Sequence, residues 1–140
     1  MTILVSACLL GENCKYNGGN NLNERVLRYL AGHEIIPVCP EMLGGLSSPR
    51  KPVEWRDGHA VTRDGDDWTA EFRLGVARAM ALIGDRPIYL AILQSRSPTC
   101  GVKQVYDGTF TGRKIPGQGA LAKALAERGI PLMDAEDVPE

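Results

Sequence analysis

The chain alternates short apolar runs with segments of helical periodicity, and this alternation restricts the fold more than any other feature. The apolar runs are residues 2–7, 34–38, 87–93 and 130–133, and the helical segments are residues 20–32, 67–84 and 120–129. Short apolar runs with β-branched members are typical of strands buried on both faces. Strands and helices in this order fold through right-handed crossovers into a parallel sheet. We therefore predict an α/β fold, a Rossmann-like three-layer sandwich with a mostly parallel sheet of about four strands.

Two of the helical segments have recognisable ends. The first places Asn21 three residues before Glu24, a spacing similar to a capping box, and stops at Gly32. The second begins near Asp67, its predicted cap, and stops at Gly84. These ends predict two well-defined helices in the first two-thirds of the chain.

Long connections join the later elements. Residues 39–66 form a connection rich in Gly and Pro, and its Asp57-Gly58 pair predicts a small hairpin. Residues 94–119 form a second long connection. Loops of this length in a compact domain are usually functional, so we expect the site to involve them.

Composition limits the classes of partner. The 140 residues, 44% of them hydrophobic, suffice for one core, and no repeat or linker divides them, so we predict a single domain over residues 1–140. The formal net charge of -1 argues against a surface built for nucleic acid or an anionic membrane. The N-terminus lacks the basic and apolar parts of a signal peptide, and no apolar run reaches the ~20 residues that span a bilayer. We predict a cytoplasmic protein whose thiols stay reduced.

The four cysteines all follow predicted strands. Cys8 follows the first strand, with Cys14 in the same loop, Cys39 ends the second strand, and Cys100 lies in the loop after the third. Parallel sheets bind their ligands beyond the carboxyl ends of the strands. We therefore expect the cysteines to meet at that edge, although free cysteines are also common as small core residues.

Spacing alone leaves several kinds of cysteine site open. The gap from Cys8 to Cys14 is too long for the closely spaced pairs of structural zinc sites. His33 lies near a helix end and His59 in a polar turn segment, where a histidine is more often a surface residue than a metal ligand. An iron–sulfur cluster is held by thiolates, and three protein thiolates leave one iron of a four-iron cluster open. Zinc, a thiol nucleophile and core cysteines remain the alternatives.

Polar residues accompany the cysteines. Glu41 follows Cys39 by two residues and is a candidate general acid or base or a solvated loop acid. Hydroxyls in the segment before Cys100 are candidates for bonds to a cluster sulfur or a substrate carbonyl: Ser95, Ser97 and Thr99. Two glycines before residue 120 predict free N–H groups at the start of the third helix, which would bind an anion or an electron-rich oxygen. An ordinary glycine turn is the alternative.

Four sequence blocks together resemble a bacterial family first described as a domain of unknown function, whose characterised members are thiouracil desulfidases. The blocks are VSACLLGENCKYNG, PVCPEMLGGLSSPRKP, ILQSRSPTCG and VYDGTFTG with the following GQGALAKAL. The resemblance covers nearly the whole chain. It implies an α/β architecture, an oxygen-sensitive 4Fe-4S cluster on three cysteines, and removal of sulfur from 2-thiouracil or 4-thiouracil to give uracil and sulfide.

Position by position, the resemblance implies Cys8, Cys39 and Cys100 as cluster ligands, with Glu41 and Ser97 as catalytic groups. Cys14 matches the second cysteine of the opening block and is a candidate catalytic or sulfur-handling thiol.

This chain departs from the family at two positions. Family members often have lysine before the SRSP sequence and serine before the last cysteine, where this chain has Gln94 and Thr99. Thr99 keeps a hydroxyl, and Gln94 loses a charge that would influence the choice of substrate.

The mechanism we expect is hydrolytic. The thiocarbonyl sulfur of the substrate would bind the open iron, which would act as a Lewis acid, and water would attack the ring carbon. Glu41 would manage the proton, and Ser97 would orient the ring or a cluster ligand. The implied partners are a thiolated pyrimidine and proteins that accept sulfur or assemble iron–sulfur clusters. A membrane is not expected as a partner. Nucleic acid is disfavoured as a partner because the one stretch rich in basic residues is short.

Two other functions compete with this hypothesis. A non-catalytic metal or iron–sulfur binding module would need the cysteines but neither Glu41 nor Ser97. A thiol reductase would use Cys8 and Cys14, whose spacing differs from the C-x-x-C pairs that lower a thiol pKa.

Overall fold

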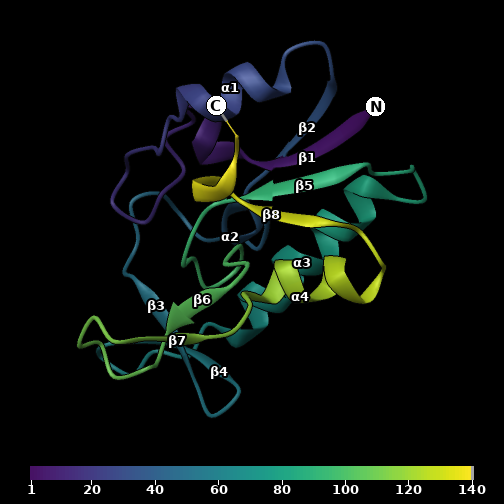
Figure 1. Ribbon diagram of the computed structural model, residues 1–140. Coiled ribbons are helices and arrows are strands. Elements are labelled where there is room, and N and C mark those ends of the chain that lie inside the picture. Colours follow the sequence, from purple (N-terminus) through teal and green to yellow (C-terminus); the bar gives the residue numbers. More distant parts are fainter. Residues whose placement is uncertain (140) are drawn as a thin grey trace.

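The computed structural model describes residues 1–139 and contains a four-stranded parallel sheet in the order β2-β1-β5-β8. The strands are β1 (Thr2–Ser6), β2 (Glu34–Val38), β5 (Leu90–Leu93) and β8 (Leu132–Asp134). They correspond to the four apolar runs of the sequence, and the predicted α/β fold with a parallel sheet is confirmed. The carboxyl ends of β1, β2 and β5 therefore open onto one edge of the sheet (Figure 1).

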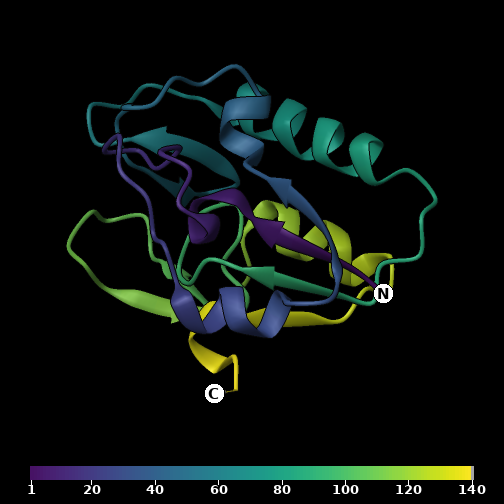
Figure 2. The ribbon, with the colours of Figure 1, turned by 90° about the horizontal axis from the view of Figure 1, so that it is seen from above.

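Helices cover both faces of this sheet. They are α1 (Glu24–Leu30), α2 (Pro40–Leu43), α3 (Thr69–Ile83) and α4 (Ala120–Glu127). Helix α1 packs on one face, and α3 and α4 pack on the other (Figures 1 and 2). In β1 the side chains alternate accordingly, since Ile3 and Val5 join the α1 core and Leu4 joins the α3–α4 core. All three are fully buried, which explains why the run reads as continuously apolar.

Two helix starts differ from the prediction. Helix α1 begins at Glu24, and Asn23 caps it by accepting a hydrogen bond from the N–H of Val26 at 3.1 Å. The prediction that Asn21 caps this helix was wrong, because the Asn21 side chain is used elsewhere. The N-cap of α3 is Trp68 and not the predicted Asp67, although Asp67 Oδ1 accepts a hydrogen bond from the N–H of Thr69 at 2.9 Å.

Two hairpins lie outside the sheet. The predicted one pairs β3 (Val53–Arg56) with β4 (His59–Thr62), and both turn residues between them have positive φ. A second, not predicted, pairs β6 (Gln104–Tyr106) with β7 (Lys114–Pro116). Short 3-10 helices follow β1 and β8, at Ala7–Leu10 and Ala135–Asp137. Within residues 1–139, every helix is too short or too polar to cross a bilayer.

Candidate active site

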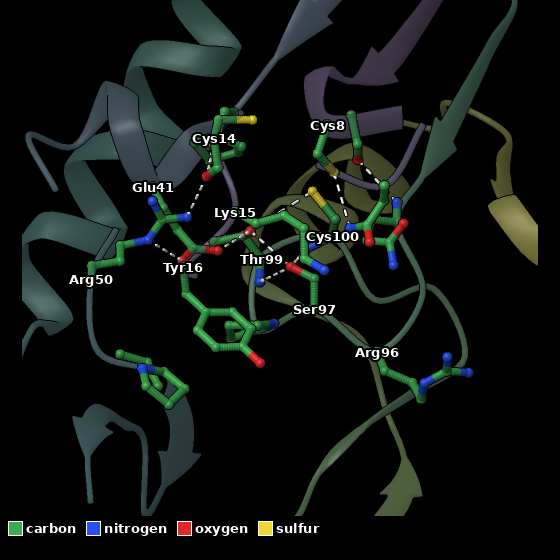
Figure 3. A pocket seen from close by; sticks show the side chains of 18 of the residues that line it. Cys8, Cys14, Lys15, Tyr16, Glu41, Arg50, Arg96, Ser97, Thr99 and Cys100 are labelled. Carbon is green, nitrogen blue, oxygen red and sulfur yellow. Dashed lines mark hydrogen bonds and ion pairs between the residues drawn. The ribbon is translucent and has the colours of Figure 1, made fainter. Parts of the chain in front are cut away.

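A cavity of about 570 Å³ opens at the carboxyl edge of the sheet, and all four cysteines line it (Figure 3). Cys8 lies in the 3-10 helix after β1, Cys39 is the N-cap of α2 directly after β2, and Cys100 lies in the loop after β5. Cys14 reaches the cavity from the loop that follows Cys8. The topology therefore brings together the four thiols, as the sequence predicts. None is oxidised to a disulfide.

Three of the thiols interact directly. Hydrogen bonding with the Cys14 thiol is the main cause that lowers the pKa of Cys8 and lowers the pKa of Cys39 to about 7. The same contacts raise the pKa of Cys14 well above its ordinary value. Cys8 and Cys39 are thus the thiols most easily converted to thiolates, the form that binds metals.

Hydrogen-bond donors also reach the sulfurs from outside the thiol group. Asn21 Nδ2 donates a hydrogen bond to Cys8 Sγ at 3.5 Å. The Asn21 side chain therefore bonds to Cys8 instead of capping α1. Burial raises the pKa of Cys100 to about 12, although bonds from Ser6 and Thr99 oppose the shift. Donors of this kind stabilise a bound thiolate.

The donor set, four thiols around one cavity, fits an iron–sulfur cluster. In the part of the chain that the structure describes, no group of three or more His, Cys, Asp or Glu side chains is arranged to hold one metal ion. The cysteines stand instead around a cavity, and a cluster fills more space than one ion. Soft thiolate ligands are the chemistry that iron–sulfur clusters require, and the pKa is lowered at Cys8 and Cys39.

The turn that carries Cys100 is fixed by hydrogen bonds to its backbone N–H and carbonyl groups. Ser97 Oγ accepts from the N–H groups of Thr99 at 3.1 Å and of Cys100 at 3.0 Å. The first N–H groups of α4 donate to carbonyls of the same turn, with Ala120 N bonded to Pro98 O at 3.0 Å. An anion site at this helix start is therefore wrong, because the oxygens that accept from its N–H groups are the carbonyls of Pro98 and Thr99.

The contact between α4 and this turn depends on a glycine. A Cβ at Gly119 would lie 2.4 Å from the carbonyl carbon of Thr99, a distance that no side chain tolerates. Gly119 therefore serves close packing of the helix against the Cys100 turn.

Glu41 lies on α2 and faces the cavity between two partners (Figure 3). Its Oε1 pairs with Arg50 Nε at 3.0 Å, and its Oε2 lies 3.1 Å from the Thr99 hydroxyl that donates to it. The Arg50 side chain is only 5% exposed and that of Glu41 13%, so this ion pair is largely withdrawn from water. The carboxylate is held in one position beside the turn of Cys100.

Arg50 ties three cavity segments together and was not predicted as a site residue. Besides Glu41, its guanidinium donates to Ser47 O at 2.9 Å and to Cys14 O at 2.8 Å. The sequence offered only an arginine in a Gly- and Pro-rich loop, and no spacing rule links it to Glu41. Lys15 and Tyr16 also line the cavity without having been predicted.

The two histidines lie elsewhere. The His33 ring stacks near Tyr29 and Tyr89, with centroid distances of 6.5 and 6.3 Å. His59 Nδ1 lies 2.9 Å from Asp67 Oδ2. Among the described residues, those that line the cavity include neither histidine.

Comparison with known proteins gives three findings. A model of the family described as 2-thiouracil desulfurase matches residues 3–137. The uncharacterized protein YbbK of Bacillus subtilis (strain 168) is 34% identical over 146 residues, which cover 97% of this chain and 97% of YbbK. A solved structure described as the 4Fe-4S-dependent thiouracil desulfidase TudS has a TM-score of 0.91 and 37% identity, covering 99% of this chain and 93% of that one. The fold described above is thus shared over nearly the whole chain.

Proposed function

The chain belongs to the 2-thiouracil desulfurase family, and we propose that it is an enzyme that hydrolyses the carbon–sulfur bond of a thiolated pyrimidine with the help of a 4Fe-4S cluster. For 2-thiouracil or 4-thiouracil the products are uracil and hydrogen sulfide. The thiocarbonyl and one water are consumed, and no carbon changes its oxidation state. The cytoplasm, where thiols stay reduced, is the proposed location.

One observation carries this proposal: four free thiols from three separate segments and a fixed carboxylate line the same cavity. Cys8, Cys39 and Cys100 would hold the cluster, one from each of three strand ends. When bound, the cluster supplies a Lewis-acidic iron that polarises a thiocarbonyl. A non-catalytic metal module would not need a carboxylate and an arginine buried beside the thiols.

Glu41 is the proposed proton-handling group. Arg50 occupies Oε1, so Oε2 is the oxygen available to take a proton from the attacking water. Thr99 donates to the same oxygen and holds the carboxylate plane toward the cavity. This arrangement is that of a positioned general base, with the arginine compensating its charge.

Ser97 has two proposed tasks. Its oxygen accepts two N–H groups and so fixes the Cys100 turn, which leaves its proton free for the Thr99 hydroxyl at 3.1 Å or for a substrate oxygen or nitrogen. Cys14, whose thiol contacts Cys8 and Cys39, is a proposed sulfur-handling group. Released sulfide passes to solvent or to a sulfur-accepting protein, and cluster-assembly proteins are the proposed source of iron.

Anaerobic reconstitution with iron and sulfide tests the proposal. The expected result is close to four irons per chain, visible absorption of a cluster, and release of uracil from 2-thiouracil or 4-thiouracil. Glu41→Gln is expected to keep the iron and lose turnover about 100-fold or more, the size of a general-base contribution. A protein that takes up only zinc, or a Glu41→Gln variant of full activity, would refute the proposed chemistry.

A further inference from the structure

The connection between β6 and β7, residues 107–113, lines the cavity but has no role in the proposed chemistry. Phe110 and Gly112 of this connection contribute to the lining, together with Val53, Glu54 and Arg63 of the other hairpin. Strands β3 and β6 contact each other, and the two hairpins lie side by side (Figure 1). The hairpins therefore form a second wall, separate from the loops that carry the cysteines.

Glu54 anchors this wall. Its Oε1 accepts hydrogen bonds from the N–H groups of Gly108 at 2.9 Å and Phe110 at 3.2 Å. The neighbouring Arg56 donates to Gly108 O from Nε at 2.9 Å and from a second guanidinium nitrogen. Side chains of β3 thus hold both polar groups of Gly108.

The backbone at this anchor is unusual. Phe110 has a φ of +57°, a region that bulky residues seldom adopt. Gly108 has a φ of +92°, and a Cβ there would lie 2.7 Å from Trp55 O. A conformation that is unfavourable in isolation persists only where its surroundings over-determine it. Here the two bonds to Glu54 supply part of that constraint.

The aromatic ring of Phe110 is oriented by two arginines. Arg56 and Arg63 place their guanidinium carbons 5.8 and 5.6 Å from the ring centroid, within the range of cation–π contacts. Arg63 also donates to Phe110 O at 3.2 Å. The ring is therefore a fixed part of the cavity wall.

We propose that Phe110 contacts the pyrimidine ring of the bound substrate and that Glu54 is a positioning residue which sets Phe110 in place. The inference rests on the proposed function, because it takes the cavity to receive a planar heterocycle. An aromatic side chain offers such a ring a π-face contact that does not depend on the exocyclic sulfur. The contact is equal for thiouracil before and after desulfuration, so it affects binding and not the chemical step.

The test compares steady-state kinetics of reconstituted variants with 2-thiouracil. Phe110→Ala and Glu54→Ala are expected to raise KM about tenfold, the loss typical of removing one base–aromatic contact, and to leave kcat nearly unchanged. Glu54→Gln keeps a carbonyl acceptor for both N–H groups and is expected to keep the wild-type KM. Glu127→Ala, an exposed change on α4, is the matched control. Iron content and thermal midpoint are measured for every variant.

Several results would overturn the inference. The first is a KM equal to that of the wild type in Phe110→Ala or in Glu54→Ala. The second is a lower kcat in either variant that is accompanied by a lower iron content. If Glu54→Ala does not fold, Phe110→Ala alone decides the matter. The Phe110 ring is partly exposed and lies outside the buried core, so its removal is expected to leave the protein folded. If the wild-type protein releases no uracil, the proposed function fails separately. Equilibrium dialysis then measures the affinity of the same proteins for 2-thiouracil. Weaker binding by both alanine variants than by the wild type supports the inference. Binding equal to that of the wild type, or no binding by any of the proteins, refutes it.

Discussion

Arg50 joins three segments beside the cavity through its bonds to Glu41, Ser47 and Cys14. Replacement by methionine keeps much of the side-chain volume but leaves the Glu41 carboxylate buried without its partner and removes the bond to Cys14 O. Breaking a buried ion pair in this way costs about 3–5 kcal/mol. We expect Arg50→Met to lower the free energy of unfolding by that order and to abolish turnover, as measured by urea denaturation and uracil release.

A control separates this effect from loss of charge. Arg73 is exposed on α3, so Arg73→Met is expected to change the free energy of unfolding by less than about 0.5 kcal/mol. Equal effects of the two variants would show that the buried pair with Glu41 contributes nothing of its own.

Cys14 tests which thiols hold iron. It contacts Cys8 and Cys39, so geometry alone does not set it apart from the three proposed ligands. If Cys8, Cys39 and Cys100 are the ligands, Cys14→Ala retains close to four irons per chain and Cys39→Ala does not. Iron determination after anaerobic reconstitution decides, and a Cys14→Ala protein without iron would make Cys14 a ligand.

The sequence predicted the residues whose place follows from topology and missed those placed by loop geometry. Cys8, Cys39 and Cys100 follow strand ends, and parallel strands share one edge, so their meeting could be foreseen. Arg50 reaches Glu41 and Cys14 through the path of an irregular loop, which no periodicity encodes. The bond from Asn21 to Cys8 was hidden for the same reason, since the capping pattern around Asn21 suggested a local role instead.

At the scale of elements, the packing of α2 against α3 sets the position of Cys39 and Glu41. A Cβ on Gly75 of α3 would lie 1.9 Å from Pro40 O, and one on Gly44 would lie 2.0 Å from Glu71 O. Only glycines allow the two backbones to approach this closely. The first turn of α2, with Glu41 on it and Cys39 at its cap, is thereby held against a long, stable helix.

Gly75→Ala should push α2 away from α3. We expect a loss of stability of about 1–3 kcal/mol, the cost of overpacking a close contact, together with reduced iron content because Cys39 moves with α2. Thermal denaturation and iron determination measure the two effects.

Ala77→Gly is the comparison for Gly75→Ala. Ala77 is exposed on the same helix, so this change costs about 1 kcal/mol through helix propensity and leaves the iron content unchanged. Loss of iron from Ala77→Gly to the same extent would contradict a specific role for the glycine contact.

Element prediction failed where the elements are short. Helix α2 has only four residues, begins with a proline and ends before a glycine, so it has no periodicity to detect. The β6–β7 hairpin has strands of three residues in a segment rich in turn-forming residues. The start of α4 was predicted as an anion site because free N–H groups are the rule at helix starts, but carbonyls of the Cys100 turn fill that role here.

At the scale of the whole molecule, the cavity lies at the end of the apolar core. Fully buried residues of β1 and β5 fill two apolar layers against α1 on one face and against α3 and α4 on the other. Cys8 and Cys14 belong to the first layer and Cys100 to the second, and all three also line the cavity. The core therefore supports the site directly, while most of its residues lie away from the cavity.

Removal of iron tests how far the fold depends on the site. Since most residues of the two apolar layers do not line the cavity, chelation under anaerobic conditions is expected to leave the far-ultraviolet circular dichroism unchanged. The thermal midpoint should fall, because a group that binds only the folded state stabilises it. Hydrogen exchange should accelerate in the cysteine loops, residues 8–21, 39–51 and 95–101, and remain slow in β1 and β5. Global unfolding on chelation, the behaviour of small zinc-dependent domains, would mean that the cluster and not the sheet holds this molecule together.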